Sequence, residues 1–374
     1  MTMLGGITMR RLSNPFTPTF GRVPYALAGR DELIDDVMEG LANQPGDPNR
    51  STIFIGPRGS GKTVLLRSIS QEASRMGWVC VSVSARKGML DKIVGRAHVN
   101  AHHLLVEQSK SSVSSIQVGP VALGREVKRE EVPWWLDIQN MVEQLNEQGI
   151  GLLVTIDEID PTCEELIDFI DTYQHFVSEE RDVALLMAGL PGQVSALLQD
   201  KNVSFIRRAF QRHLRPIDRY DVEEAIYETL ASKGKAIDND ALAVAVEAAH
   251  GLAFAVQLVG YYLWRVCGAD ETIDVRDAEE AASISRRELV NSIVEPTLSE
   301  LTQRELEYVT AMAQDAGPSS TSDVAARMGI SMTNASNLRR RLITYGIIVD
   351  RRMGVVDFEL PLMREYLRGE VTPR

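Results

Sequence analysis

The chain has 374 residues, of which 44% are hydrophobic and 25% are charged, a composition typical of a soluble globular protein with two or three domains. Its formal net charge of −12 argues against a protein that coats nucleic acid indiscriminately, although a locally basic surface is compatible with that total. No apolar stretch approaches the ~20 residues of a membrane helix, and residues 1–21 lack the apolar core of a signal peptide. We therefore expect a cytoplasmic protein with a flexible N-terminus. Its three widely spaced cysteines, Cys80, Cys163 and Cys267, fit reduced core residues.

A phosphate-binding loop follows the first strong strand signal. The apolar run 52–55 predicts a buried strand, and residues 64–73 carry a helical pattern. Between them lies a complete G-x-x-x-x-G-K-[ST] motif (Walker A), whose glycines let successive backbone N–H groups point at a polyphosphate. Lys62 can reach the β- and γ-phosphates, and Thr63 can ligate Mg²⁺. The chain is therefore expected to bind ATP. The loop consists of Gly56, Pro57, Arg58, Gly59, Ser60, Gly61, Lys62 and Thr63.

Strand and helix signals then alternate, which indicates a parallel sheet covered by helices on both faces. Strands are predicted at 78–83, 151–156 and 183–188, and helices at about 90–106 and 134–146. The segment 107–133, which contains a Ser-rich stretch, indicates a polar loop or β-hairpin inserted in this domain. The expected fold class is therefore α/β, with a parallel sheet of the P-loop NTPase type.

An acidic motif ends the strand predicted at 151–156. A carboxylate there can hold Mg²⁺ directly or through water, which is the Walker B role that we assign to Asp157. Glu158 is placed to polarise the attacking water as general base. The alternative is an acidic turn that caps the next helix, and Asp160 in particular can simply precede that helix.

Five arginines follow the strand predicted at 183–188. Arginines here can stabilise charge on a transferring γ-phosphate, in cis or across the interface of a homo-oligomer, and Arg208 and Arg212 are the members that we favour. The alternative is a solvated basic helix. The cluster consists of Arg207, Arg208, Arg212, Arg215 and Arg219. The histidines at 98, 102 and 103 are expected to be surface residues of a helix rather than metal ligands.

Two further domains are predicted after the sheet. Helical patterns at 222–231, 240–249, 254–266 and 277–290 indicate a small helical domain. Helices then follow at 301–313, 322–328 and 333–345, the second with Ser322 or Thr321 as its cap, and 347–360 predicts two strands around a Gly-containing turn. Three helices followed by a hairpin is the order of a winged helix-turn-helix.

The predicted winged helix carries side chains suited to duplex DNA. Asn and Arg side chains of the third helix can meet base edges and phosphates, and the hairpin arginines can touch the adjacent backbone. However, residues 299–374 contain ten Arg, no Lys and ten Asp plus Glu, so the domain is neutral, and a winged helix that contacts a partner protein stays an alternative. The DNA-binding candidates are Asn334, Asn337, Arg339, Arg340, Arg351 and Arg352.

Taken together, these motifs resemble the AAA+ superfamily, on the side of the archaeal-ATPase, STAND-like and origin-recognition-type ATPases. The resemblance implies that the Gly29-Arg30-Asp31-Glu32 segment lies against the nucleotide base, which adds Gly29 and Arg30 to the expected cofactor-binding residues. It also implies a helical lid after the sheet. The expected domains are a flexible N-terminus at 1–21, an ATPase domain at 22–218 with the insertion 107–133, a lid at 219–296 and a winged helix at 297–374.

Two departures separate the chain from the origin-recognition-type pattern. That pattern has a polar sensor at the end of the fourth strand, where this chain has Ala188-Gly189-Leu190, and a lid arginine, where this chain has Gly251-Leu252-Ala253-Phe254. Both departures are similar to the archaeal-ATPase or STAND side and imply slow hydrolysis. The function expected is a nucleotide-dependent ATPase switch that associates with DNA. The alternative is a STAND-like signalling regulator whose winged helix contacts proteins.

Overall fold

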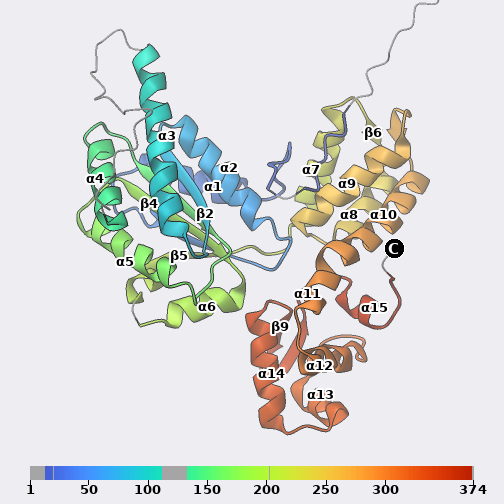
Figure 1. Cartoon of the computed structure of the whole chain (residues 1–374). Helices are drawn as coiled ribbons and strands as arrows, with labels where there is room; N and C mark the ends of the chain where they lie inside the picture. Colours follow the sequence, from blue (N-terminus) through green and yellow to red (C-terminus); the bar gives the residue numbers. More distant parts are fainter. Residues whose placement is uncertain (1–12, 20, 112–132, 202, 373–374) are drawn as a thin grey trace, which may run out of the picture. The chain divides into compact units, whose positions relative to one another are not determined.

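The structure, a computed structural model of the chain, describes residues 13–19, 21–111, 133–201 and 203–372 (Figure 1). Most of the predicted insertion 107–133 and residues 1–12 of the N-terminus lie outside these described residues. The chain divides into two compact units, of which the first comprises 1–29, 216–300 and 361–374 and the second 30–215 and 301–360. Each unit is described separately.

A five-stranded sheet in the order β2-β3-β4-β1-β5 forms the centre of the second unit, and every neighbouring pair is parallel. Its strands are β1 (Ser51–Ile55), β2 (Val79–Ser84), β3 (Leu152–Asp157), β4 (Val183–Gly189) and β5 (Phe210–His213). The first four confirm the sequence prediction. The fifth was not predicted, and because it places Arg212 on an edge strand, the alternative of a solvated basic helix is wrong for this residue.

Alternating side chains divide the core between the two faces of this sheet. Ile53 and Ile55 of β1 point to one face, where α3, α4, α5 and α6 pack, whereas Phe54 points to the other face, against α1 and α2. Figure 1 shows these two layers of helices around the strands. The helices are α1 (Asp31–Ala42), α2 (Lys62–Arg75), α3 (Met89–Ser111), α4 (Trp134–Asn146), α5 (Glu164–Ser178) and α6 (Pro191–Gln199), with the 3₁₀ turns Pro48–Arg50 and Ser204–Arg208.

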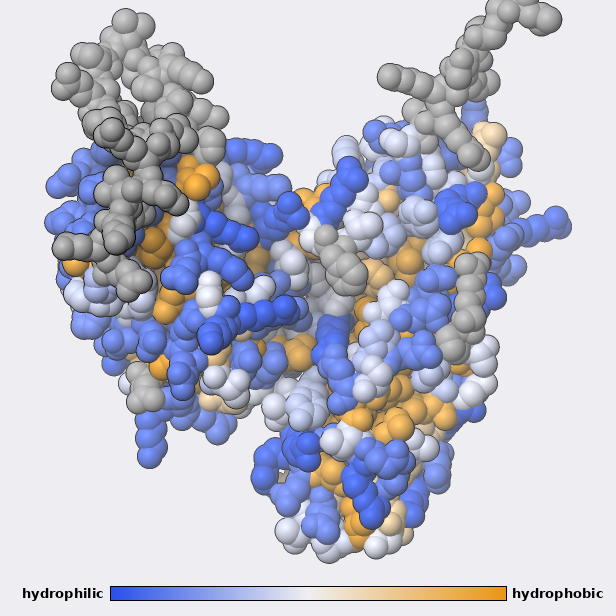
Figure 2. Space-filling view, in the orientation of Figure 1, coloured by the Kyte–Doolittle hydropathy of each residue, from blue (hydrophilic) through white to orange (hydrophobic). Residues whose placement is uncertain are grey.

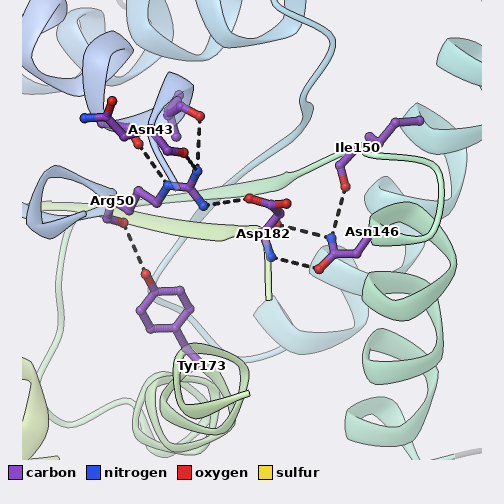
Figure 3. A network of polar contacts seen from close by, with 8 residues as sticks. Asn43, Arg50, Asn146, Ile150, Tyr173 and Asp182 are labelled. Carbon is purple, nitrogen blue, oxygen red and sulfur yellow. Dashed lines mark hydrogen bonds and ion pairs between the residues drawn. The ribbon is translucent and has the colours of Figure 1, made fainter. Parts of the chain in front are cut away.

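A buried arginine fixes the edge of the sheet where β1 begins (Figure 3). Arg50 is 3% exposed and donates to the carbonyls of Gly40 (2.9 Å) and Leu41 (3.2 Å), so it satisfies carbonyls at the end of α1. It also pairs with Asp182 (2.8 Å), and its guanidinium lies over the Trp78 ring. Because Gly40 and Leu41 lie at the end of α1 and Asp182 directly precedes β4, this network ties α1 to the start of β4.

The first unit is mainly helical. Helices α7 (Arg219–Ala231), α8 (Asn239–Ala249), α9 (Ala253–Cys267) and α10 (Val275–Leu289) confirm the four predicted helices, and a π-helical turn (Val290–Val294) and α11 (Glu295–Ser299) follow. The short parallel pair β6 (Ala236–Ile237) and β7 (Thr272–Ile273) was not expected, because two-residue strands carry too little pattern to detect. The C-terminal α15 (Met363–Leu367) also belongs to this unit.

The described part of the N-terminus packs against the helical unit. Phe16 is 2% exposed within the core of the helical unit, and a Cβ at Gly260 would lie 2.2 Å from its ring. Asn14 donates to the Tyr261 carbonyl (3.0 Å), and the Thr17 backbone N–H donates to Gln257 (3.1 Å). Residues 14–17 therefore contact α9, and the flexibility of 1–21 stays a prediction.

The remaining part of the second unit, 301–360, has the predicted three helices and hairpin, and we call it the C-terminal module. Its elements are α12 (Gln303–Ala313), β8 (Ser319–Ser320), α13 (Thr321–Met328), α14 (Met332–Thr344), β9 (Ile348–Arg352) and β10 (Val355–Phe358), with sheet order β8-β10-β9. Ser320 caps α13 by accepting from the Ser322 N–H, so the cap lies one residue before the predicted Thr321. On the face drawn in Figure 2, hydrophilic residues predominate and hydrophobic ones form small groups.

Candidate nucleotide-binding site

The phosphate loop lies between β1 and α2 at the carboxyl edge of the parallel sheet. Gly59 (φ 77°) and Gly61 (φ 92°) adopt the left-handed conformation that glycine tolerates best, which allows the backbone to curl before α2 begins at Lys62. A Cβ at Gly56 would lie 2.7 Å from the Ser60 hydroxyl oxygen, so the turn has no room for a side chain there. The local geometry thus confirms the strand–loop–helix context that the motif requires.

Lys62 is folded back onto its own loop. Its Nζ donates to the carbonyls of Gly56 (2.8 Å) and Pro57 (2.7 Å). Burial lowers the pKa of Lys62 to about 8, an effect that the negative charge of Asp157 opposes and that of nearby Arg58 reinforces. A polyphosphate that offered oxygens to this ammonium would replace carbonyl partners with charged ones, which is the stronger interaction.

Thr63 and Asp157 meet although they are far apart in sequence. The Thr63 hydroxyl donates to Asp157 Oδ2 (2.5 Å), and Asp157 Oδ1 accepts the backbone N–H of Glu158 (2.9 Å). A carboxylate and a hydroxyl at contact distance beside a phosphate loop supply the hard oxygen ligands that Mg²⁺ prefers. The residues present therefore fit the ion that the motifs imply.

Glu158 has a strained backbone and a charged partner. Its φ of 55° is unusual for a residue with a side chain, and such strain is found mainly at functional sites. The side chain is 59% exposed, and its Oε2 pairs with Arg86 Nη2 at 2.5 Å. The carboxylate that we expected to act as general base is thus held by a guanidinium.

Sequence reasoning missed Arg86. It lies two residues after β2, whose last residue Ser84 is paired with Asp157 across the sheet. Glu165 of α5 fixes the turn between β2 and α3, because its carboxylate accepts the backbone N–H groups of Gly88 (2.7 Å) and Leu90 (3.1 Å). Desolvation raises the pKa of Glu165, but the backbone hydrogen bonds together outweigh it, so the pKa is lowered. Arg86 is brought near Glu158 by the pairing of β2 with β3, and the sequence motifs do not show that these two strands are neighbours.

The other predicted ATPase residues contact protein groups outside the phosphate loop and the acidic motif after β3. Arg30 precedes α1 and donates to the Arg215 carbonyl (3.0 Å), while Gly29 (φ 58°) approaches Asp221 so closely that a Cβ would lie 2.4 Å from its Oδ2. Arg212 pairs with Asp36 of α1 (2.8 Å) and lies over the Phe210 ring. Arg208 is exposed at the end of the 3₁₀ turn Ser204–Arg208, and its role stays a prediction.

Several arginines of the C-terminal module form ion pairs with carboxylates of the same module. Arg339 pairs with Asp350 (2.5 Å), Arg351 lies 3.7 Å from Asp357, and Arg341 lies 3.0 Å from the buried Glu305. Of the predicted DNA contacts, Asn334, Asn337, Arg340 and Arg352 are exposed, and within the described part of the chain Arg340 and Arg352 form no ion pair. The sequence did not reveal which arginines were already paired.

Two expectations concern residues away from this site. His98, expected on a helix surface, lies on α3 and contacts Asp137 at 2.9 Å; Cys80, Cys163 and Cys267 are all unbridged. In the portion of the chain that the structure covers, no helix is both long and apolar enough to cross a membrane.

Comparisons with known proteins agree with this architecture. Residues 291–367 match a domain of unknown function (DUF8462). A stretch of 83 residues is 30% identical to the RecA protein of Pseudomonas fluorescens, over 22% of this chain, and the chain spans about a quarter of the length of that relative (23%). The fold is similar to that of the Walker-type ATPase PABY2304 of Pyrococcus abyssi, with a TM-score of 0.68 and 15% identity over 91% of this chain and 96% of that one.

A second solved structure has the same architecture. The ORC2 protein of Aeropyrum pernix, in ADPNP-ADP complexes, has a TM-score of 0.63 and 15% identity over 94% of this chain and 96% of its own. Both matches extend over the sheet, the helical unit and the C-terminal module. The chain therefore shares the fold of these two proteins, in which a parallel sheet with a phosphate loop is combined with a helical unit and a C-terminal module.

Proposed function

We propose that this chain binds and hydrolyses ATP and acts as a nucleotide-dependent switch. The observation that carries this proposal is the convergence of Lys62, Thr63, Asp157 and Glu158 at one edge of the sheet. The similarity of the fold to a Walker-type ATPase and to a protein solved in ADPNP-ADP complexes supports it.

In this proposal each residue has a distinct task. The N–H groups of the phosphate loop and Lys62 bind the phosphates, and Glu158 takes the proton of the attacking water. Thr63 and Asp157 would hold Mg²⁺, which when bound neutralises phosphate charge. Because Arg86 pairs with Glu158, the general base must leave that guanidinium before it can orient a water, so we expect the pair to reduce basal turnover by at most about five-fold.

We further propose that the C-terminal module is a winged helix that binds duplex DNA. Helix α14 would enter the major groove, and the β9–β10 hairpin would contact the backbone. The exposed Arg340 and Arg352 are the strongest contacts in this proposal, because Arg339 and Arg351 are engaged by Asp350 and Asp357. The ion pairs of Arg339 and Arg351 also leave fewer guanidiniums available for DNA phosphates, and this favours the alternative, a STAND-like regulator whose module contacts a protein.

Nucleotide binding is tested by titrating the purified chain with a fluorescent ATP analogue. We expect wild type to bind and Lys62→Ala to lose at least about ten-fold in affinity, because a charge-assisted contact is removed. Equal affinity in the two proteins would refute the role of Lys62.

DNA binding is tested by fluorescence anisotropy with labelled duplex DNA at low salt. Arg340→Ala combined with Arg352→Ala should weaken binding and reduce the salt slope by about 2, since each phosphate contact contributes ~1. Arg304→Ala, which removes an exposed arginine of α12 from the same module, is the matched control. If wild type does not bind, or if the control weakens binding equally, the alternative regulator is favoured.

A further inference from the structure

A cavity of about 570 Å³ lies between α4 and α5, on the helix layer that covers the Ile53 face of the sheet. Trp134 and Trp135 line it from α4, Asp168, Asp171 and the buried Phe176 line it from α5, and Glu179 lines it from the position directly after α5. All these residues belong to the second unit, and all except Glu179 lie within α4 or α5. None of them belongs to the phosphate loop or to the acidic motif after β3.

The cavity combines two features that select a cation. The faces of tryptophan rings attract cations, and Trp135 is 48% exposed instead of being buried with the core. The carboxylates stand at positions 168, 171 and 179, and the i, i+3 spacing of Asp168 and Asp171 puts both on one face of α5. A phosphate group would meet these negative charges without a counterion, so a nucleic acid does not fit here.

One of the lining carboxylates already pairs with a guanidinium of the chain. Arg181 Nε lies 3.2 Å from Glu179 Oε2, so Glu179 is paired within the chain. Asp168 and Asp171 stand two to three turns earlier on α5, and Asp171 lies 3.9 Å from the exposed His175, which is charged only when protonated. The end of the cavity lined by Asp168 and Asp171 is therefore the end at which a second cation is accommodated.

The cavity has room for more than one amino-acid side chain, and its tryptophan lining suits a protein segment. Sites of ~300–1,000 Å³ hold ligands larger than one amino-acid side chain, and tryptophan and arginine are both enriched where proteins meet. Arginine matches this cavity better than lysine, because its planar guanidinium stacks on an aromatic ring and pairs with a carboxylate in two parallel contacts.

We propose that the cavity between α4 and α5 binds an arginine side chain presented by a basic segment of a partner protein. The guanidinium stacks on Trp135 and pairs with Asp168 or Asp171, and the neighbouring residues of the segment fill the rest of the cavity. This interaction site is separate from the nucleotide site and stands whether or not the chain hydrolyses ATP.

The test titrates the full chain with a fluorescein-labelled peptide that carries two arginines among glycines, at low salt, with anisotropy as the readout. A peptide with citrulline in place of arginine keeps the shape and removes the charge, and a lysine peptide keeps the charge without the planar group. We expect the arginine peptide to bind, the lysine peptide to bind less tightly, and the citrulline peptide not to bind.

Variants locate the binding. Trp135→Ala and Asp168→Asn should each weaken binding by about two- to five-fold, the range expected for exposed cation–π and ion-pair contacts, and Trp135→Phe should restore part of the loss. Glu224→Gln removes the same charge from an exposed position on α7 and is the control. The proposal is overturned if the arginine peptide does not bind, if citrulline binds equally, or if Glu224→Gln weakens binding as much as Asp168→Asn.

Discussion

Removing the Arg86 side chain should accelerate basal ATP hydrolysis. Arg86 pairs with Glu158 at 2.5 Å, and the two side chains are 72% and 59% exposed. Ion pairs that exposed contribute ~0.2–1 kcal/mol, so the pair reduces the population of available Glu158 by no more than about five-fold. Arg86→Ala should therefore raise the turnover number without DNA by up to about five-fold, with the Michaelis constant for ATP little changed.

The assay is phosphate release at saturating ATP, measured beside two other variants. Arg86→Lys keeps a cation and should fall between wild type and Arg86→Ala. Arg75→Ala removes an arginine of the same exposure, paired with Glu72 on α2, and should leave turnover unchanged. A fall in turnover for Arg86→Ala would mean that Arg86 assists the reaction, and it would refute the reasoning that the pair restrains Glu158.

Three further outcomes follow from the structure. Because the pKa of Lys62 is lowered to about 8, the free protein loses this positive charge above that pH, so ATP affinity should fall from pH 8 to 9.5 by up to ~10-fold per unit, whereas Lys62→Ala should give a flat profile on a fluorescent analogue. Replacing the buried Arg50 by leucine leaves the carbonyls of Gly40 and Leu41 without their donor, while Asp182 is partly exposed to water, so it should lower the free energy of unfolding by ~1–3 kcal/mol in urea titrations, against under ~0.5 kcal/mol for Arg75→Ala. Thr302→Ala removes the side-chain cap of α12 and should cost ~1 kcal/mol in the same assay.

The parts of the fold with strong periodicity were predictable from sequence. The strands around Ile53, Leu153 and Leu186 are continuous apolar runs, a pattern typical of strands in a sheet that is buried on both faces. The strand around Arg212 was not predictable. It is four residues long, polar and mostly exposed at the edge of the sheet, so neither its composition nor its period separates it from a basic helix.

The candidate site divides in the same way. Lys62, Thr63 and Asp157 were predictable because phosphate and Mg²⁺ chemistry fixes their residue types and their positions after strands. Arg86 was not, since its link to Glu158 depends on which strands are neighbours and on the turn that Glu165 holds. The pairing of Arg339 with Asp350 was missed for a similar reason: a helix and a hairpin separated in sequence meet only in the folded module.

The measurement that tests the central claim most directly is ATP turnover and ATP affinity of Glu158→Gln beside wild type. The substitution keeps the shape of the side chain and removes its ability to take a proton. Our account predicts that the variant binds ATP as tightly as wild type and loses turnover by at least about 100-fold, the lower range for general-base catalysis. Turnover equal to that of wild type, with binding unchanged, would contradict the assignment of Glu158 and with it the proposed hydrolytic site.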